Sequence, residues 1–339
     1  MAVVLGHAFS LTPDIGNRSF GLAMLAVGQV GVDIFFVISG FIIANSSTAL
    51  SASRGRGGAL DFAIKRAKRI YPLYWIVLLT AFIASQPIPG STFQGLHVGP
   101  DSFPHEITPD LVLLTTPANH YVPVAWTLCF EVNFYALITL VILIAPRHVI
   151  EVALFFMGLL AVAGLPFFSP PGIWGSPLIF EFSLGLLIAY ITKSGILAFR
   201  LLSIAVAITL LAYGAVLQIS NDHIDNLIRL ATFGFGAGFL IYGIVSSELN
   251  GTKFPAFLQY LGDISYSLYM WHQILLIALA TLMIKRSPAW MPSSLLVVTW
   301  LGCILIVAAA SHKYIERGLP KWLREVFRRK SKGLLSSQP

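Results

Sequence analysis

Three ionisable side chains lie inside long apolar stretches of this sequence. They are His7 in VVLGHAF, Asp33 in GVDIFFVISGFII and Glu131 in AWTLCFEVNFY. An imidazole with an ordinary pKa of about 6.5 can accept a proton near neutral pH, and a neighbouring carboxylate can orient it and stabilise the imidazolium. Brought together, these residue types would support proton transfer in an apolar setting.

The apolar stretches predict the elements that position these groups. Of the 339 residues, 56% are hydrophobic and 11% are charged, whereas about 25% are charged in an average soluble protein. The mean hydropathy is +0.79. Apolar runs of about 20 residues span a bilayer core of about 30 Å when they are helical. We therefore predict an all-α fold, a polytopic transmembrane helix bundle.

About ten spans are expected. The first is incomplete, because only Met1 to Gly6 precede His7, so we expect this helix either to begin upstream or to insert part-way. Cys129 and Cys303 fall in separate spans and indicate neither a disulfide framework nor a metal cluster. The predicted spans lie near 1–9, 26–45, 71–84, 122–145, 149–168, 178–192, 201–219, 230–247, 257–281 and 293–311.

The lysines and arginines predict the orientation. If the C-terminal tail is cytoplasmic, 18 of the 22 lie on the cytoplasmic side, and none occurs from Ile70 to Pro146. The positive-inside rule then places both termini in the cytoplasm and the segment between the third and fourth spans outside. Basic loops and a basic tail facing anionic lipid account for the net charge of +7, so no nucleic-acid partner is expected.

This orientation predicts similar depths for the polar groups, in the outer half of the membrane. Asp33 would lie about 9 Å and Glu131 about 12 Å below the outer ends of their helices, with His7 near the outer end of its own. Each charge would cost at least ~2.5 kcal/mol facing lipid, so these groups should face a polar interior and partner one another. The structural alternative is a helix-to-helix hydrogen bond, for Glu131 with a Ser, Trp or Tyr. Glu181 is expected nearer the interface.

A basic cluster precedes the third span, in DFAIKRAKRIYPLYW. Arg66 and Arg69 are three residues apart, so on a helix they share a face and could clamp a polyphosphate bidentately. The alternative is a positive-inside anchor that binds lipid headgroups, and the sequence leaves both open.

Together these motifs resemble acyltransferase family 3, integral membrane proteins that O-acylate cell-envelope carbohydrates. The resemblance rests on five stretches in the expected order between residues 7 and 272: VVLGHAF, GVDIFFVISGFII, KRAKRIYPLYW, AWTLCFEVNFY and LGDISYSLYMWH. The details around IFEFSLGLLIAY look most similar to the branch that acetylates exopolysaccharides and related glycans.

The resemblance implies roles for the matching positions. His7 corresponds to the presumed catalytic histidine, Glu131 to an essential polar residue of the core, and Arg66 and Arg69 to a pair that handles the acyl-CoA donor from the cytoplasm. We expect His7 to be the general base, with Glu131 as its orienting partner and Asp33 as the alternative.

Substrate contacts are expected from Trp126, Tyr266 and His272. Trp126 lies beside Glu131 in its motif, and the other two come from LGDISYSLYMWH. Trp126 or Tyr266 could donate a hydrogen bond to the oxyanion of the reacting thioester. For His272, a structural hydrogen bond is the alternative.

The expected function is O-acyl transfer, with acetyl as the default, from cytoplasmic acetyl-CoA to a hydroxyl of an exported glycan. The resemblance implies exopolysaccharide, the O-antigen of lipopolysaccharide or a similar acceptor, a bacterial inner (plasma) membrane location, contact with membrane lipids and no metal. The alternative function is a secondary transporter or exporter of a glycan or small solute using the same polar core. A scaffold for polysaccharide synthesis is a third possibility.

Two domain-level expectations complete the prediction. Residues 1–312 should form the membrane-embedded acyltransferase domain, and residues 313–339 a basic cytoplasmic tail lying at the interface. The proline-rich loop before the fourth span is expected to be an acceptor-facing cap, with His97, His105 and His120 at its surface. Gly234 and Gly238, four apart, suit close helix packing.

Overall fold

The structure is a computed structural model that describes residues 1–10, 18–86, 107–115, 120–163, 172–221, 224–283 and 293–318. Within these ranges the chain is helical and contains no strand, which confirms the all-α prediction. The predicted tail beyond residue 318 lies outside the described residues. The α-helices are α1 (Ala2–Ser10), α2 (Arg18–Arg54), α3 (Gly58–Ser85), α4 (Ile107–Val112), α5 (Trp126–Ile144), α6 (Val149–Ala163), α7 (Phe180–Lys193), α8 (Arg200–Asn221), α9 (Asn226–Arg229), α10 (Phe235–Leu249), α11 (Ala256–Asp263), α12 (Ser265–Met283) and α13 (Ser293–Ser311).

Each predicted span overlaps at least one helix in the described residues, but not every helix is long enough to cross a membrane by itself. Among the described residues, a bent pair formed by α11 and α12, with an angle of 61° between them, would add a sixth candidate to five long apolar stretches. The count of ten spans and the cytoplasmic termini stay predictions. The five stretches are Phe20–Ser85, Pro123–Ile144, Arg200–Asn221, Asn226–Leu249 and Ser294–Glu316.

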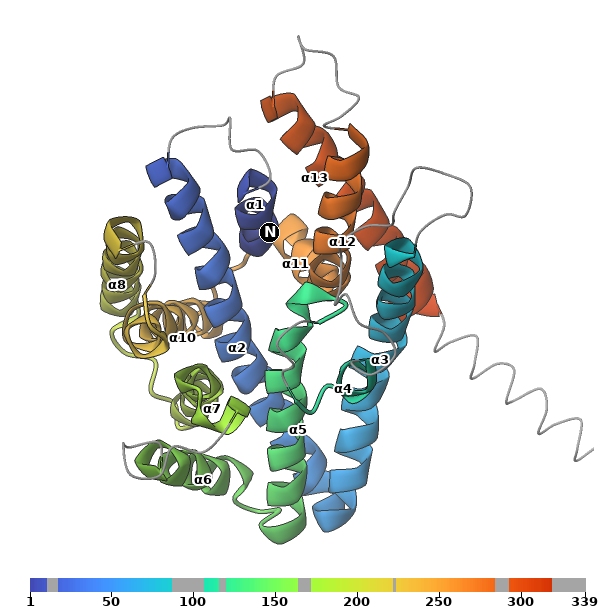
Figure 1. The fold of residues 1–339 in the computed structure, drawn as a ribbon. Coiled ribbons are helices and arrows are strands. Elements are labelled where there is room, and N and C mark those ends of the chain that lie inside the picture. The colour runs from blue at the N-terminus through green and yellow to red at the C-terminus, as the bar shows by residue number, and fades with distance from the viewer. Residues whose placement is uncertain are drawn as a thin grey trace, which may run out of the picture.

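Helix α2 runs through the centre of the molecule. Figure 1 shows α6, α7, α8 and α10 on one side of it and α3 and α5 on the other, with α1, α12 and α13 grouped around its N-terminal half. A Cβ atom added to Gly40 would lie 2.2 Å from the carbonyl oxygen of Phe182 on α7, and one added to Gly185 would lie 2.2 Å from that of Val37. Two glycines at the crossing therefore let the backbones of α2 and α7 touch.

Helix α10 and the helical turn Leu230–Gly234 before it also pack on α7 through glycines. A Cβ atom at Gly234 would lie 3.2 Å from the Cγ atom of Glu181, and one at Gly238 would lie 3.3 Å from a methyl group of Leu184. These two positions therefore face α7 closely, as the sequence predicts.

Aromatic rings fill the space between α2, α5 and α7. Phe36 lies at the centre, with ring-centroid distances of 4.8 Å to Phe182, 5.6 Å to Phe130 and 6.2 Å to Trp126. Phe36 and Phe182 are fully buried. This packing fixes α5 against α2, so the polar groups of the two helices keep a defined relative position.

The segment 107–115 does not lie over the outer end of the bundle. It is inserted between α3 and α5, as Figure 1 shows for α4. Tyr71 and Trp75 of α3 donate hydrogen bonds to the carbonyl oxygens of Val112 and Leu111, at 2.7 and 3.1 Å. Asn133 of α5 donates to that of Leu114 at 3.0 Å.

Asn133 lies ten residues beyond Pro123 on the α5 side, which is ~15 Å of helix. Residues 107–115, the described part of the predicted outer cap, therefore pack along the sides of α3 and α5.

His120, predicted to be a surface residue, is buried. It is 7% exposed, and its Nδ1 atom bonds to the fully buried carboxylate of Asp110. The backbone N–H of Tyr121 donates to the same carboxylate at 2.8 Å. The surface prediction for His120 was therefore wrong. Residues 107–115 carry Asp110 into the interior, where its charge needs hydrogen-bond donors. His97 and His105 lie outside the described residues.

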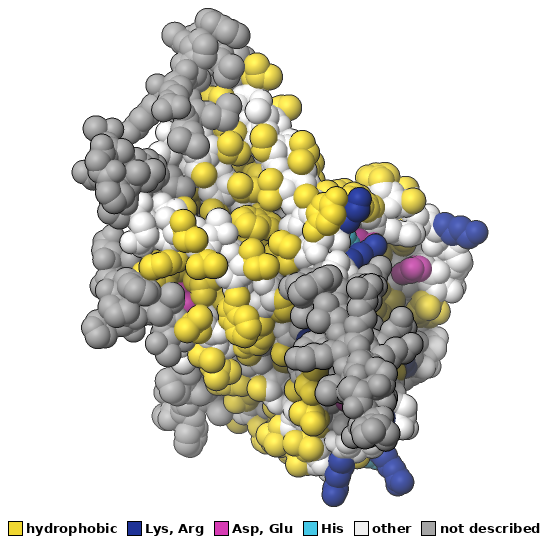
Figure 2. All heavy atoms as spheres, turned by 90° about the vertical axis from the view of Figure 1, so that its right-hand side faces the viewer, with side chains coloured by type: hydrophobic (Ala, Val, Ile, Leu, Met, Phe, Trp, Pro, Cys, Tyr) yellow, Lys and Arg dark blue, Asp and Glu magenta, His cyan; other side chains and the backbone are white. Residues whose placement is uncertain are grey.

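The outer surface of the bundle is apolar. Figure 2 shows the face that lies on the right of Figure 1, where hydrophobic side chains cover a broad area and Lys and Arg stand at its margins. Exposed apolar side chains include Trp75, Leu79 and Ile83 of α3 and Val298 and Ile306 of α13. Such a surface is stable against lipid and would be a liability in water.

Candidate active site

His7 contacts His272 near the N-terminal end of the bundle. The Nδ1 atom of His7 lies 3.1 Å from the Nε2 atom of His272, and the two rings stack with centroids 5.2 Å apart. The Nδ1 atom of His272 lies 2.6 Å from the carbonyl oxygen of Tyr269, one turn earlier on α12. His272 is fully buried, whereas His7 is half-buried.

The close approach of α1 to α2 sets the position of His7. The adjacent Gly6 has no side chain between the two helices: a Cβ atom there would lie 2.9 Å from the carbonyl oxygen of Met24 and 3.2 Å from the Cα atom of Gly28. The short α1 therefore lies directly on α2, and its imidazole points toward α12.

A small cavity adjoins the His7 side chain. Its volume is about 100 Å³, and since a water takes about 30 Å³ in the liquid, it fits a few waters or a group the size of acetyl. Five α-helices and the 3-10 helix Pro123–Ala125 meet in its wall. The lining residues are Val3, Gly6, His7, Leu25, Gly28, Gln29, Val32, Val124, Trp126, Arg229 and Tyr269.

Trp126 and Tyr269 give this cavity its aromatic wall. The Tyr269 hydroxyl lies 2.8 Å from that of Thr127 and donates to the carbonyl oxygen of Val124 at 3.2 Å, which ties α12 to the first turn of α5. Its ring stacks on Phe35 of α2, with centroids 6.0 Å apart. The structure thus brings Trp126 and His272, both predicted to contact substrate, to the same site as His7.

Asp33 forms a buried ion pair with Arg229. The Nε atom of Arg229 lies 2.9 Å from one carboxylate oxygen of Asp33, and Nη2 lies 3.2 Å from the other. Asp33 is fully buried and Arg229 is 8% exposed. The carboxylate of Asp225 caps α9 by accepting from the backbone N–H of Leu227 and Ile228, so the one-turn helix that carries Arg229 has a fixed start.

Glu181 lies beside this ion pair. It was expected near the membrane interface, but it is fully buried, and both Asp33 and Arg229 are close enough to act on its carboxyl group. Its expected depth near the interface stays a prediction, and its burial follows from the crossing of α7 and α2 at Gly40 and Gly185, which brings the first turn of α7 against α2. Arg229 is hydrogen-bonded to Asp33, and the Glu181 carboxyl group lies next to this ion pair.

Glu131 lies apart from the His7 cavity. Its carboxylate accepts a hydrogen bond from the Tyr135 hydroxyl one turn further along α5, and Ser39 of α2 lies next to it. Neither Glu131 nor Asp33 bonds to His7 among the described residues.

The expected His7–carboxylate contact is thus replaced by the His7–His272 contact. The reason is that the His7 cavity and Glu131 lie at different positions along the axis of α5. The His7 cavity adjoins Trp126, and Glu131 is five residues, or ~7.5 Å of helix, further on.

Arg66 and Arg69 lie near Glu131. The guanidinium of Arg66 donates to the Ser46 hydroxyl and lies over the rings of Phe62 and Tyr135, 5.2 and 5.4 Å from their centroids. Arg69 is exposed, and both cations act on the Glu131 carboxylate. The two arginines therefore share a helix face, and Tyr135 connects Arg66 to Glu131.

A groove of about 410 Å³ opens beside this cationic pair, between α3 and α5. Its polar side chains include Arg66, Tyr71 and Tyr135. Tyr266 lies deeper, and its hydroxyl donates to the carbonyl oxygen of Ile70 at 2.7 Å. The structure therefore places Tyr266 near the arginines rather than in the His7 cavity.

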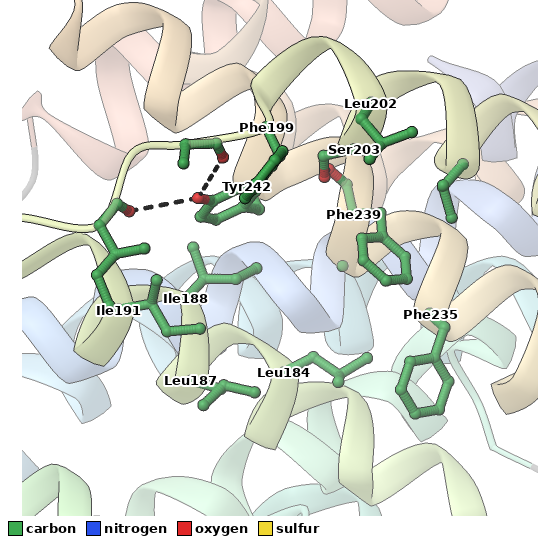
Figure 3. Close-up of a pocket in the computed structure, with 14 residues that line it drawn as sticks. Leu184, Leu187, Ile188, Ile191, Phe199, Leu202, Ser203, Phe235, Phe239 and Tyr242 are labelled. Atoms are coloured by element: carbon green, nitrogen blue, oxygen red, sulfur yellow. Dashed lines mark hydrogen bonds between the residues drawn. The ribbon is translucent and has the colours of Figure 1, made fainter.

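An apolar groove lies elsewhere. About 440 Å³ in volume, it is formed by α7, α8 and α10, and Figure 3 shows Leu184, Ile188 and Phe239 among the side chains that line it. Its hydroxyl groups are satisfied locally, since Tyr242 donates to the carbonyl oxygen of Ala198 at 2.8 Å. No predicted site residue lines this groove, so it offers no reactive group.

Arg229, Tyr269 and Glu181 are site components that the sequence reasoning did not identify as such. For Arg229 a signal existed, because a buried Asp33 needs a cation and few lie on the predicted outer side. Tyr269 stands in SYSLYMWH, one helical turn before His272. No group of three or more His, Cys, Asp or Glu side chains within the described ranges is arranged to hold a metal ion.

The sequence was also compared with known proteins. The sequence matches acyltransferase family 3, described as an acyltransferase domain, over residues 1–310. It is 31% identical over 311 residues to the exopolysaccharide production protein ExoZ of Rhizobium meliloti (strain 1021), covering 86% of this chain and 90% of ExoZ. No solved structure matches this chain.

Proposed function

This chain belongs to acyltransferase family 3, and from that premise we propose that it transfers an acetyl group from cytoplasmic acetyl-CoA to a hydroxyl of an exopolysaccharide or related envelope glycan. It is a multi-pass membrane protein. The similarity to an exopolysaccharide production protein supports the acceptor class. Its proposed location is the bacterial inner membrane.

The observation that carries this proposal is the shared cavity of His7, Trp126 and Arg229. It combines a base, a ring N–H donor and a cation in a space of about 100 Å³. In water-poor surroundings such donors stabilise developing negative charge more strongly than in bulk solvent. A cavity of this size suits the acetyl group, while the glycan would contact it from outside.

The transfer proceeds through one tetrahedral intermediate if the acyl group passes directly. The His7 imidazole takes the proton of the acceptor hydroxyl as the hydroxyl oxygen attacks the thioester carbonyl carbon. The oxyanion that forms accepts from Trp126 and faces Arg229. When the carbon–sulfur bond breaks, the CoA thiolate takes the proton from the imidazolium, which yields the O-acetyl glycan and free CoA.

Arg66 and Arg69 are proposed to hold the phosphates of the donor. Arg66 lines the groove between α3 and α5, and the exposed Arg69 lies on the same face of α3. Tyr135, at the base of this groove, is nine residues from Trp126, which is ~13 Å of helix. The pantetheine arm or a covalent acyl relay would cross this distance.

Acetylation of the envelope glycan tests the base. His7→Ala should abolish ester-linked acetate while the protein remains folded and inserted. His148→Ala is the matched control, because His148 is exposed at the loop between α5 and α6 and belongs to no part of the site. Normal acetylation by His7→Ala would contradict the assignment.

Donor binding tests the arginines separately. The double variant Arg66→Gln with Arg69→Gln should weaken acetyl-CoA binding in detergent at least tenfold, because each charge-assisted hydrogen bond contributes ~1.5–3 kcal/mol. The matched control is Arg56→Gln with Arg147→Gln, which removes the same charge from exposed positions. An unchanged affinity for acetyl-CoA would favour the alternative, in which Arg66 and Arg69 bind lipid headgroups. A purified protein that moves solute and transfers no acetyl group would favour an exporter.

A further inference from the structure

We propose that His272 is a positioning residue that fixes the tautomer of His7 and so selects the nitrogen that acts as the base. This inference deepens the proposed function and rests on His7 being the base. Its observations are the hydrogen bonds of Tyr269, His272 and His7, which form one chain from α12 to α1.

The backbone carbonyl of Tyr269 sets the direction of that chain. A carbonyl oxygen only accepts, so the Nδ1 atom of His272, 2.6 Å away, carries the proton. A neutral imidazole has one N–H, which leaves the Nε2 atom of His272 as an acceptor. The Nδ1 atom of His7, 3.1 Å from it, is then the donor. It follows that the lone pair of His7 is on Nε2.

The surroundings of His272 keep it in the state that this chain requires. It is fully buried, and its polar contacts in the described structure are the backbone of Tyr269 and Leu268 and an imidazole, with no carboxylate among them. A buried charge without a partner is costly, so His272 is neutral. The rings of Tyr269 and His7, with centroids 5.5 and 5.2 Å away, hold its plane.

In this arrangement the imidazole of His272 orients the catalytic histidine, as a carboxylate does in many hydrolases. When Nε2 of His7 takes the acceptor proton, its Nδ1–H bond to His272 becomes charge-assisted and shorter, which stabilises the imidazolium. Without the acceptor on His272, the His7 ring could place its lone pair on Nδ1, facing α12 instead of the reacting hydroxyl.

Nuclear magnetic resonance measures the tautomer without any turnover. In detergent-solubilised protein labelled with 15N-histidine, the long-range couplings show which ring nitrogen bears the proton. Signals lost in His7→Gln identify His7. We expect wild-type His7 to show a protonated Nδ1 and a bare Nε2, and a spectrum with the proton on Nε2 would overturn the proposal.

Two variants at His272 test the functional side. His272→Gln keeps an amide oxygen to accept from His7, so it should retain the tautomer and activity within about tenfold of wild type. His272→Leu fills the space without an acceptor, so kcat should fall ~10²-fold or more, the range of general-base effects, while KM for acetyl-CoA stays unchanged. Equal activity in the two variants would contradict the positioning role.

The outcomes separate this inference from the proposed function. Full activity of His7→Ala would refute the base itself, whatever the tautomer. Loss of activity in His7→Ala together with the wrong tautomer, or with His272→Gln as inactive as His272→Leu, would refute only the role of His272. His148→Gln serves as the matched control, and should His272→Leu fail to fold, the wild-type spectrum still decides.

Discussion

The crossing of α2 and α7 offers a sharp test of how the bundle is held together. We predict that Gly185→Ala destabilises the protein strongly for a change of one methyl group. The added Cβ atom would lie 2.2 Å from the carbonyl oxygen of Val37 and 2.5 Å from the backbone nitrogen of Phe41. Both neighbours are backbone atoms, so no side-chain rotation can relieve the contact.

The expected magnitude follows from the separation that relief requires. Ordinary van der Waals contacts of a Cβ atom begin at 3.4 Å, so α2 and α7 would have to move apart by about 1 Å, and overpacking of this kind costs ~1–3 kcal/mol. Gly40→Ala meets the carbonyl oxygen of Phe182 at the same distance and should cost a similar amount. Because one separation relieves both contacts, the double variant should cost little more than either single one.

Unfolding in detergent, followed by heat or denaturant, measures these effects. Gly158→Ala is the control, since a Cβ atom there would meet nothing within 4 Å and alanine is the better helix former. The reasoning fails if Gly185→Ala is as stable as Gly158→Ala, or if the costs of the two crossing variants simply add.

Three further predictions concern buried polar groups. Asp33→Asn should destabilise the protein by up to ~3–5 kcal/mol because it leaves the charge of Arg229 unpaired, and adding Arg229→Gln should recover part of the loss; strictly additive unfolding free energies would contradict the pairing. Asp110→Ala should cost ~1–3 kcal/mol by removing the acceptor of His120, so an unchanged denaturation midpoint would argue against a buried pair. Trp126→Phe keeps the ring and removes the N–H, so kcat for acetyl transfer should fall ~10²–10³-fold at constant KM; a wild-type kcat would exclude the indole as an oxyanion donor.

The positions of the helices could be predicted because they follow from local patterns. Apolar runs in a chain with few charges leave helices as the favoured structure in a membrane, and the ten predicted segments all coincide with helices. Whether each one crosses the bilayer depends also on tilt, bending and pairing. The 61° bend between α11 and α12, for example, lies in LGDISY, which contains no proline.

The partners of the buried groups could be predicted only in part. Depth along a helix indicated that His7, Asp33 and Glu131 belong to a polar interior, and all three are at least half-buried. Which groups touch depends on helix rotation and on contacts between distant segments. His7 and His272, separated by 265 positions, meet because α1 packs between α2 and α12.

Residues 107–115 show a different limit of prediction from sequence. Its sequence, ITPDLVLL, is apolar but much shorter than a span, and the surrounding prolines and glycines favour a loop. Its position is decided by donors on other helices, Tyr71, Trp75 and Asn133, whose role cannot be seen from local pattern. The signal available in the sequence was Asp110, a charged residue within an apolar stretch.

The same segment constrains the order of assembly during biosynthesis. Residues 107–115 leave the ribosome before α5 exists, so the carbonyl oxygen of Leu114 has no Asn133 to accept from while the preceding helices enter the bilayer. In hydrocarbon an unsatisfied carbonyl is too costly to persist. The contact between residues 107–115 and α5 can therefore form only after α5 has been made, which places this packing late in assembly.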